Sequence, residues 1–214
     1  MTIIFGILLG IIICIPIGPI NLITIKLTTK NKRTDALFLA LGGSVMDVVY
    51  FLVFLLGLSF VQFSAKTTMV FKLLGISFIF LLGLIEVVKY FKILKLSNDE
   101  SKKDLEAIEN KTSGFLSFIS GVVIYTSNPT LVASMSGLAA FVKSSGFVPM
   151  TLPFIVLFSF FAGVGTFLWF VFLTGLVVRY KNKFNDQFML KLNLSFGVLI
   201  MIVAMVMATR LFLS

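Results

Sequence analysis

The sequence predicts an all-α integral membrane protein with six transmembrane helices, arranged as two inverted three-helix repeats in which helices 1 and 4 are broken. Composition gives the class: of 214 residues, 58% are hydrophobic, only 13% are charged and 25 are phenylalanine. A water-soluble domain of this size cannot bury so much apolar surface. The number of helices follows from six apolar runs, each longer than the about 20 residues that a helix needs to cross the hydrocarbon core.

The first apolar run, Ile3–Ile25, is predicted to be a retained membrane helix. It has no basic segment before it, no small-residue cleavage site after it, and it is too long for the apolar core of a signal peptide. The remaining runs are Ala36–Phe60, Met69–Phe91, Gly114–Val142, Pro149–Val178 and Phe188–Leu213. All of them are long enough to span the bilayer, some with tilt.

The orientation of these helices follows from the basic residues between them. Fourteen of the 18 lysines and arginines fall in the connections after the first, third and fifth runs. Positively charged connections stay in the cytoplasm, so both termini are predicted to lie outside. The same distribution accounts for the formal net charge of +9 without a nucleic-acid partner.

A charged linker divides the chain into two parts of three runs each. Residues 92–113 contain "KILKLSNDESKKDLEAIENK", which mixes both signs of charge and is predicted to be a solvated cytoplasmic linker. The first repeat would then cover residues 1–91 and the second residues 114–214. Because three is an odd number of spans, a repeat of this kind must be inverted across the membrane, which is an architecture of many secondary transporters.

Helix-breaking residues interrupt the first and fourth runs at corresponding places. The first run contains "PIGPINL", with Pro16, Gly18 and Pro19, and the fourth contains "YTSNPTLV", with Pro129. A proline inside a helix removes an amide donor and frees a carbonyl that lipid cannot satisfy. Such a break survives only where protein or a water-filled cavity covers it, so two matching breaks indicate a binding site. The other two prolines fall near the start of the fifth run, where proline is tolerated.

Asp47, in "GGSVMDVVYFLVFLLG", is the acidic residue placed deepest in a predicted span. At 1.5 Å per residue it lies about 16 Å from the cytoplasmic end of its run, close to the bilayer midplane and near the level of the first break. An intramembrane carboxylate is costly and usually faces a cavity, a partner or a proton path. Gly42, Gly43 and Ser44, one turn away, would let another helix approach closely.

Several neutral polar and aromatic residues near the breaks are further candidates. Asn21 and Asn128 are predicted, with Asp47, to take part in substrate binding or proton coupling, either directly or by bonding freed backbone. The candidate cavity-wall residues are Tyr50, Thr126, Ser127 and Trp169. Glu86 lies three residues before Lys89 near the end of its run, which favours an interfacial ion pair over a functional role.

The residues present exclude several kinds of chemistry. A transmembrane thiol carrier needs a cysteine in each half, and the chain has only Cys14. An intramembrane aspartyl protease needs two membrane aspartates, and a serine protease needs a base, whereas the chain has no histidine. We therefore expect no enzyme activity, no metal site and no cofactor. A transporter of small solutes, an exporter of an inorganic cation and a non-transporting scaffold remain open.

Together, these motifs resemble the lysine exporter (LysE) family of small inner-membrane amino-acid exporters. The family's proline-glycine-proline-asparagine motif falls on Pro16, Gly18, Pro19 and Asn21, its glycine and aspartate on Gly43 and Asp47, its asparagine-proline on Asn128 and Pro129, and its tryptophan on Trp169. The resemblance covers nearly the whole chain. It implies export of amino acids or related small polar solutes, by proton antiport with alternating access. The partners would be a small-molecule substrate, a proton or other coupling ion and the lipid bilayer, with a homodimer left open.

Overall fold

A computed structural model describes residues 1–15, 19–60 and 114–180, and single positions between 69 and 88 and between 191 and 209. Those stretches contain the helices α1 (Thr2–Cys14), α2 (Pro19–Thr29), α3 (Arg33–Ser59), α6 (Gly114–Thr126), α7 (Pro129–Ser145) and α8 (Leu152–Arg179). No strand occurs among the described residues. The predicted all-α membrane class is therefore confirmed.

Two of the described helices, α3 and α8, are long and apolar enough to cross a membrane. The α6–α7 pair, bent by 73° at its break, makes a third candidate if it forms one span, and α1 is a shorter apolar helix. The described single positions in the third and sixth predicted runs are helical, and Gly83 lies against Gly197. The rest of those two runs, the linker 92–113 and Glu86 lie outside the described residues.

Both predicted breaks are present at the predicted places. Helix α1 ends at Cys14 and α2 begins at Pro19, while α6 ends at Thr126 and α7 begins at Pro129. Each second segment thus starts with a proline, whose missing amide hydrogen costs nothing at a helix start. Pro16 and Gly18 lie outside the described residues.

Helix α2 is followed by a tight reversal into α3. Asn31 has a positive φ of 64°, a conformation that asparagine tolerates better than most residues. The Lys32 amide donates to the Leu27 carbonyl at 2.9 Å and the Asn31 amide to the Thr28 carbonyl at 3.1 Å. These two bonds form a Schellman motif, which satisfies the last carbonyls of α2 and turns the chain back on itself.

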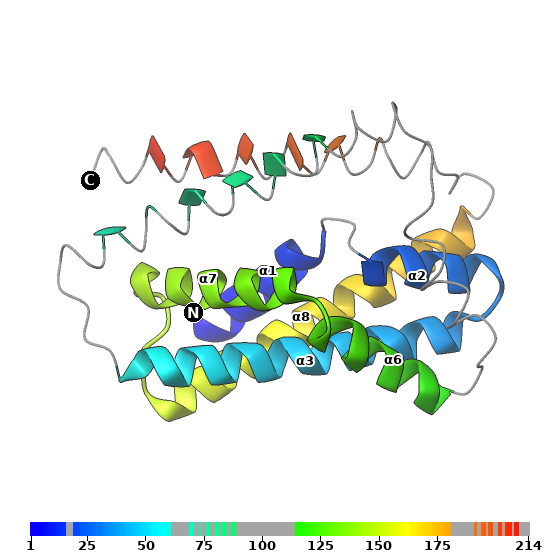
Figure 1. The fold of residues 1–214 in the computed structure, drawn as a ribbon, viewed down its shortest axis with the longest axis horizontal. Coiled ribbons are helices and arrows are strands. Elements are labelled where there is room, and N and C mark those ends of the chain that lie inside the picture. The colour runs from blue at the N-terminus through cyan, green and yellow to red at the C-terminus, as the bar shows by residue number, and fades with distance from the viewer. Residues whose placement is uncertain are drawn as a thin grey trace.

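The helices pair across the two halves of the chain. Helix α1 packs along α8 and α6 packs along α3, while α3 and α8 cross each other in the middle of the bundle (Figure 1). Helix α7 lies on α3, and α2 bridges α3 and α8. Each long helix is therefore packed mainly against the broken helix of the opposite half.

Glycines bring the paired backbones into contact. A Cβ atom on any of four glycines would lie only 2.0 to 2.2 Å from a carbonyl oxygen of the neighbouring helix. The pairs are Gly10 with Ala162 and Gly165 with Ile7 between α1 and α8, and Gly42 with Phe118 and Gly121 with Leu39 between α3 and α6. In lipid, where helices gain little from hydrophobic burial against each other, such close backbone packing is a main source of association.

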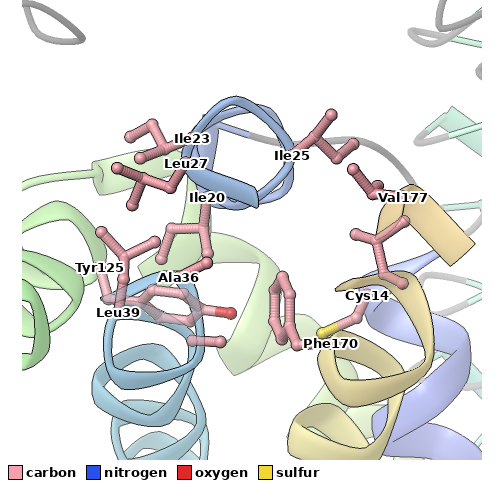
Figure 2. Packing of buried hydrophobic residues seen from close by; sticks show 12 residues of the cluster. Cys14, Ile20, Ile23, Ile25, Leu27, Ala36, Leu39, Tyr125, Phe170 and Val177 are labelled. Atoms are coloured by element: carbon pink, nitrogen blue, oxygen red, sulfur yellow. The ribbon is translucent and has the colours of Figure 1, made fainter. Parts of the chain in front are cut away.

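The buried apolar side chains form two clusters. The first cluster is Cys14, Ile20, Ile23, Ile25, Leu27, Ala36, Leu39, Ala40, Tyr125, Phe170, Leu173 and Val177 (Figure 2). The second cluster is Leu9, Phe51, Leu55, Met135, Leu138, Ala139, Val142, Val148, Ile155, Phe158 and Ala162. Along both α3 and α8, buried polar residues come between the positions that belong to the two clusters: Ser44 and Asp47 on α3, and Thr166 on α8.

Contacts at the ends of α3 also tie it to other helices. Near its start, Arg33 Nε donates to Thr174 Oγ1 of α8 at 3.4 Å. Near its end, Lys143 Nζ of α7 donates to the Leu58 carbonyl. Helix α3 is thus held to α8 at one end and to α7 at the other.

The close glycine contacts predict a position-dependent effect of one methyl group. Gly165→Ala places a Cβ against the Ile7 carbonyl and should destabilise the protein by about 1 to 3 kcal/mol, the cost of overpacking. Gly175→Ala, ten residues further along α8, meets nothing within 4 Å and should be neutral or stabilising by up to about 1 kcal/mol. Thermal unfolding midpoints of the two variants in detergent would test this. Equal midpoints would contradict the described α1–α8 packing.

Candidate functional site

Asp47 lies at the crossing of α3 and α8, and none of its side chain is exposed. Its Oδ2 atom accepts a hydrogen bond from Thr166 Oγ1 at 2.8 Å and a longer one from Tyr125 Oη at 3.4 Å. Its Oδ1 atom is buried and has no hydrogen-bond partner among the described residues. A buried carboxylate oxygen without a donor is costly, which makes this atom a candidate for binding a ligand or a proton.

The neighbours of Asp47 are placed by the packing of four helices. Tyr125 is in the last turn of α6, and its ring fits against Gly43: a Cβ atom there would lie 2.7 Å from the ring. The absence of a side chain at Gly43 therefore lets the Tyr125 hydroxyl reach Asp47 on the next turn of α3. Thr166 is next to Gly165, whose contact with α1 fixes the position of α8.

Cys14, the last residue of α1, also lies beside Asp47 and its hydrogen-bond donors. The thiol is buried and interacts with the hydroxyls of Thr166 and Tyr125. Figure 2 shows Cys14 and Phe170 on one side of the first cluster and the Tyr125 ring on the other, with the hydroxyl directed toward them. Side chains from α1, α3, α6 and α8 therefore meet around one carboxylate.

Asn21 satisfies backbone that the first break leaves free. Its Nδ2 atom donates to the Cys14 carbonyl at 2.9 Å, so the side chain of α2 reaches back to the end of α1. Its Oδ1 atom accepts a hydrogen bond from Trp169 Nε1 of α8 at 3.2 Å. Since the last carbonyls of a helix have no partner within it, Asn21 replaces a bond that an unbroken helix would make.

Tyr50 provides a hydrogen bond to freed backbone at the second break. Its hydroxyl donates to the Tyr125 carbonyl at 3.1 Å, near the end of α6. Asn128 caps the segment after the break, because its side-chain oxygen accepts from the Leu131 amide at 3.4 Å. The two breaks are thus stabilised by aromatic side chains of the long helices: Trp169 of α8 through Asn21 at the first, and Tyr50 of α3 at the second.

The remaining predicted site residues lie around these groups. Tyr50, Trp169 and Asn128 are half-buried, whereas Thr126 and Ser127 are exposed. The Thr126 hydroxyl bonds back to carbonyls of its own helix. The predicted roles of these five residues in lining a cavity or binding substrate stay predictions.

Three residues of the site were not predicted from the sequence: Cys14, Tyr125 and Thr166. Tyr125 immediately precedes Thr126, so the predicted residue was one position away from the one that faces Asp47. For Thr166 there was a signal: it precedes Trp169 by three residues, as Asp47 precedes Tyr50, which places both pairs one helical turn apart. The spacing becomes informative only once α3 and α8 are known to cross at these residues.

Among the described residues, the site contains one carboxylate and one thiol, the thiol of Cys14, as groups that could bind a metal strongly. In the part of the chain that the structure describes, no three histidine, cysteine, aspartate or glutamate side chains gather into a group suited to a metal ion. The arrangement can accept hydrogen bonds from an ammonium group, or take up a proton, at Asp47 Oδ1.

These features define a helical, multi-pass membrane protein with a polar layer at the crossing of the two long helices α3 and α8. The chain belongs to the LysE type translocator family, whose model matches residues 11–211. Members of this family are transporters and not enzymes. The predicted family is thereby confirmed.

One curated relative supports the same class. The chain is 25% identical over 196 residues to the "Putative amino acid efflux protein YcgF" of Bacillus subtilis (strain 168). The match covers 92% of this chain and 90% of the relative. No solved structure matches the chain.

The bond at the second break predicts a measurable stability loss. Tyr50→Phe removes only the hydroxyl and leaves the Tyr125 carbonyl without this partner, which should cost about 0.5 to 1.5 kcal/mol. Thr126→Val is the matched control, because that hydroxyl is exposed and serves carbonyls of its own helix, so its loss should change stability by less than about 0.5 kcal/mol. Thermal unfolding in detergent micelles compares the two. A control variant that is as unstable as Tyr50→Phe would argue against a special role for the break.

Proposed function

We propose that this protein is a secondary transporter that exports amino acids or related small polar solutes across the cell (inner) membrane, by proton antiport with alternating access. The observation that carries the proposal is the buried Asp47, with one oxygen lacking a partner, beside two broken helices. Broken helices with a carboxylate between them are the usual construction of solute and ion sites in secondary transporters. The family and the efflux relative favour export of amino acids.

An inverted repeat underlies the proposed mechanism. Both halves begin with a broken pair whose first helix, α1 or α6, has 13 residues, and continue with a long helix, α3 of 27 or α8 of 28 residues. Asp47 and Thr166 are the corresponding residues of the two long helices, followed one turn later by Tyr50 and Trp169. In this arrangement the site lies where the two repeats cross, and only the first repeat supplies a charge.

Asp47 is proposed to hold the ammonium group of the substrate. An ammonium group has donors and no acceptor, so it complements Asp47 Oδ1, which is an acceptor without a donor. The substrate carboxylate would be directed toward the helix starts after the breaks, at Pro19 and Pro129, because the N-terminal end of a helix carries partial positive charge.

The helix pairing suggests which parts move. Rocking of residues 1–91 against residues 114–214 as two blocks would separate the glycine contacts between α1 and α8 and between α3 and α6. We therefore propose that α1 moves with α8, that α6 and α7 move with α3, and that the two bodies pivot at the α3–α8 crossing. In the part of the chain that the structure describes, two hydrogen bonds cross this proposed pivot: Thr166 with Asp47, and Arg33 with Thr174.

The orientation proposed from the basic residues has a direct test. In a Cys14→Ser background, Phe147→Cys places a thiol in the exposed connection between α7 and α8, which is proposed to lie outside. Lys30→Cys places one in the exposed connection between α2 and α3, which is proposed to lie in the cytoplasm. A membrane-impermeant maleimide added to intact cells should label the first variant and reach the second only after the cells are opened. The reverse pattern would invert the proposed topology.

The transport proposal predicts that Asp47 is required for flux. In proteoliposomes preloaded with labelled lysine, threonine or leucine, wild-type protein should release at least one of them when a proton gradient is imposed. Asp47→Asn should lower this rate by roughly tenfold or more, because the amide cannot ionise or exchange a proton at neutral pH. Asp35→Asn is the matched control, since Asp35 lies in the first turn of the same helix, far from the crossing, and should leave the rate within about twofold of wild type.

The outcomes separate the function classes. If Asp47→Asn transports as fast as wild type with the same dependence on the proton gradient, the role given to this carboxylate is wrong. If no amino acid moves but a labelled inorganic cation does, the protein exports that cation instead.

A further inference from the structure

The two oxygens of the Asp47 carboxylate are in different surroundings. Oδ2 accepts hydrogen bonds from Thr166 and Tyr125, whereas Oδ1 is buried without a partner among the described residues. We propose that Thr166 is a positioning residue that keeps Oδ2 occupied, so that a proton and the ammonium group of a substrate must compete for the single atom Oδ1. This inference rests on the proposed function, and it specifies why the coupling proton and the substrate cannot occupy Asp47 at the same time.

Thr166 is suited to hold Oδ2 continuously. Its hydroxyl is 2.8 Å from Asp47 Oδ2 and 3.4 Å from the Gly10 carbonyl, so the shorter bond, to the carboxylate, is the preferred one. The side chain is fully buried, and Gly165 beside it is packed on the α1 backbone, so the backbone of Thr166 cannot move away from Asp47 without separating α8 from α1. Tyr125 adds a second, longer bond to the same oxygen.

Both occupants of Oδ1 are compatible with these bonds, but not with each other. When a proton is on Oδ1, Oδ2 becomes the carbonyl oxygen of a neutral acid and can still accept from both hydroxyls. When an ammonium group binds Oδ1, the carboxylate must be ionised to receive it. Binding of the cation therefore releases one proton, and the total charge at the site is the same before and after the exchange.

Among the described residues, the other titratable groups that face Asp47 do not offer a second place for the proton. They are the Cys14 thiol from α1, the Tyr125 hydroxyl from α6 and the Tyr50 hydroxyl from α3 itself. Helix α8 contributes Thr166, which does not titrate. Thiols and phenols ordinarily carry their protons at neutral pH, with reference pKa values of about 8.5 and about 10. A fully buried carboxylate without a cation is costly to ionise, so Asp47 is the group at this site that takes up and releases a proton.

The test measures proton release on binding by the purified full-length protein in a weakly buffered detergent solution with a pH dye. The probe is whichever of lysine, threonine or leucine the wild-type protein transports. At a pH low enough that Asp47 carries a proton before binding, wild type should release close to one proton for each molecule bound, and its apparent Kd should rise with acidity by up to about tenfold per pH unit. Thr166→Val removes the shorter of the two hydrogen bonds to Oδ2, so that the ammonium group can bind there while the proton stays on Oδ1. Proton release should then fall severalfold, and the Kd should lose most of its pH dependence. Thr166→Ser restores the hydroxyl and should restore both.

The possible results either support or overturn the inference. Proton release that is lost in Thr166→Val and regained in Thr166→Ser supports it. Release that is unchanged in Thr166→Val, or absent already in a wild-type protein that transports the amino acid, overturns it and leaves the export function standing. If Thr166→Val does not fold, Tyr125→Phe removes the longer bond to the same oxygen and should lower the release in the same direction but by less; an unchanged value there overturns the inference as well. A wild-type protein that moves no amino acid would instead overturn the proposed function itself.

Discussion

The structure depends on one constraint: backbone groups freed by a broken helix must find partners inside the protein, because lipid offers none. Both breaks meet this constraint with side chains from elsewhere in the bundle. At the first break, the Cys14 carbonyl is bound by Asn21, which Trp169 of α8 holds in place. At the second, the Tyr125 carbonyl is bound by Tyr50 of α3. Each break is therefore bonded to one of the long helices, and these polar contacts lie in the region between the two breaks.

This polar layer is possible because the surrounding packing is tight. Apolar clusters lie on both sides of it along α3 and α8, and glycines allow α1 to contact α8 and α6 to contact α3 at backbone distance. The absence of a side chain at Gly43 admits the Tyr125 ring, whose hydroxyl then reaches Asp47. A charge in a membrane interior is stable only with such support, so the same glycines that join the helices also make the site.

The groups around Asp47 and the α3–α8 crossing bear on how a transporter of this family could work. The site has one carboxylate, two hydroxyls and a thiol, which is the basis for proposing that it binds a single positive charge. The two carboxylate oxygens are unequal because the hydroxyls bind only one of them. The α3–α8 crossing carries both this site and the proposed pivot. In the proposed mechanism, occupation of Asp47 and movement of the two long helices are coupled through Thr166, which bonds the carboxylate from the other half of the chain.

The sequence by itself determined the membrane class, the places of both breaks, and Asp47 as a buried acid. Hydrophobicity, proline chemistry and charge are properties of the residues themselves and do not depend on how the helices pack. It also indicated that Gly42 and Gly43 admit a neighbouring helix, but not which one. Only the tertiary structure decided that α1 packs on α8, that Tyr125 and not Thr126 faces the carboxylate, and that Asn21 bonds the backbone of the first break. The reason is physical: the Asp47 bonds to Tyr125 and Thr166 join residues 78 and 119 positions apart, and contacts of that range are set by how whole helices pack.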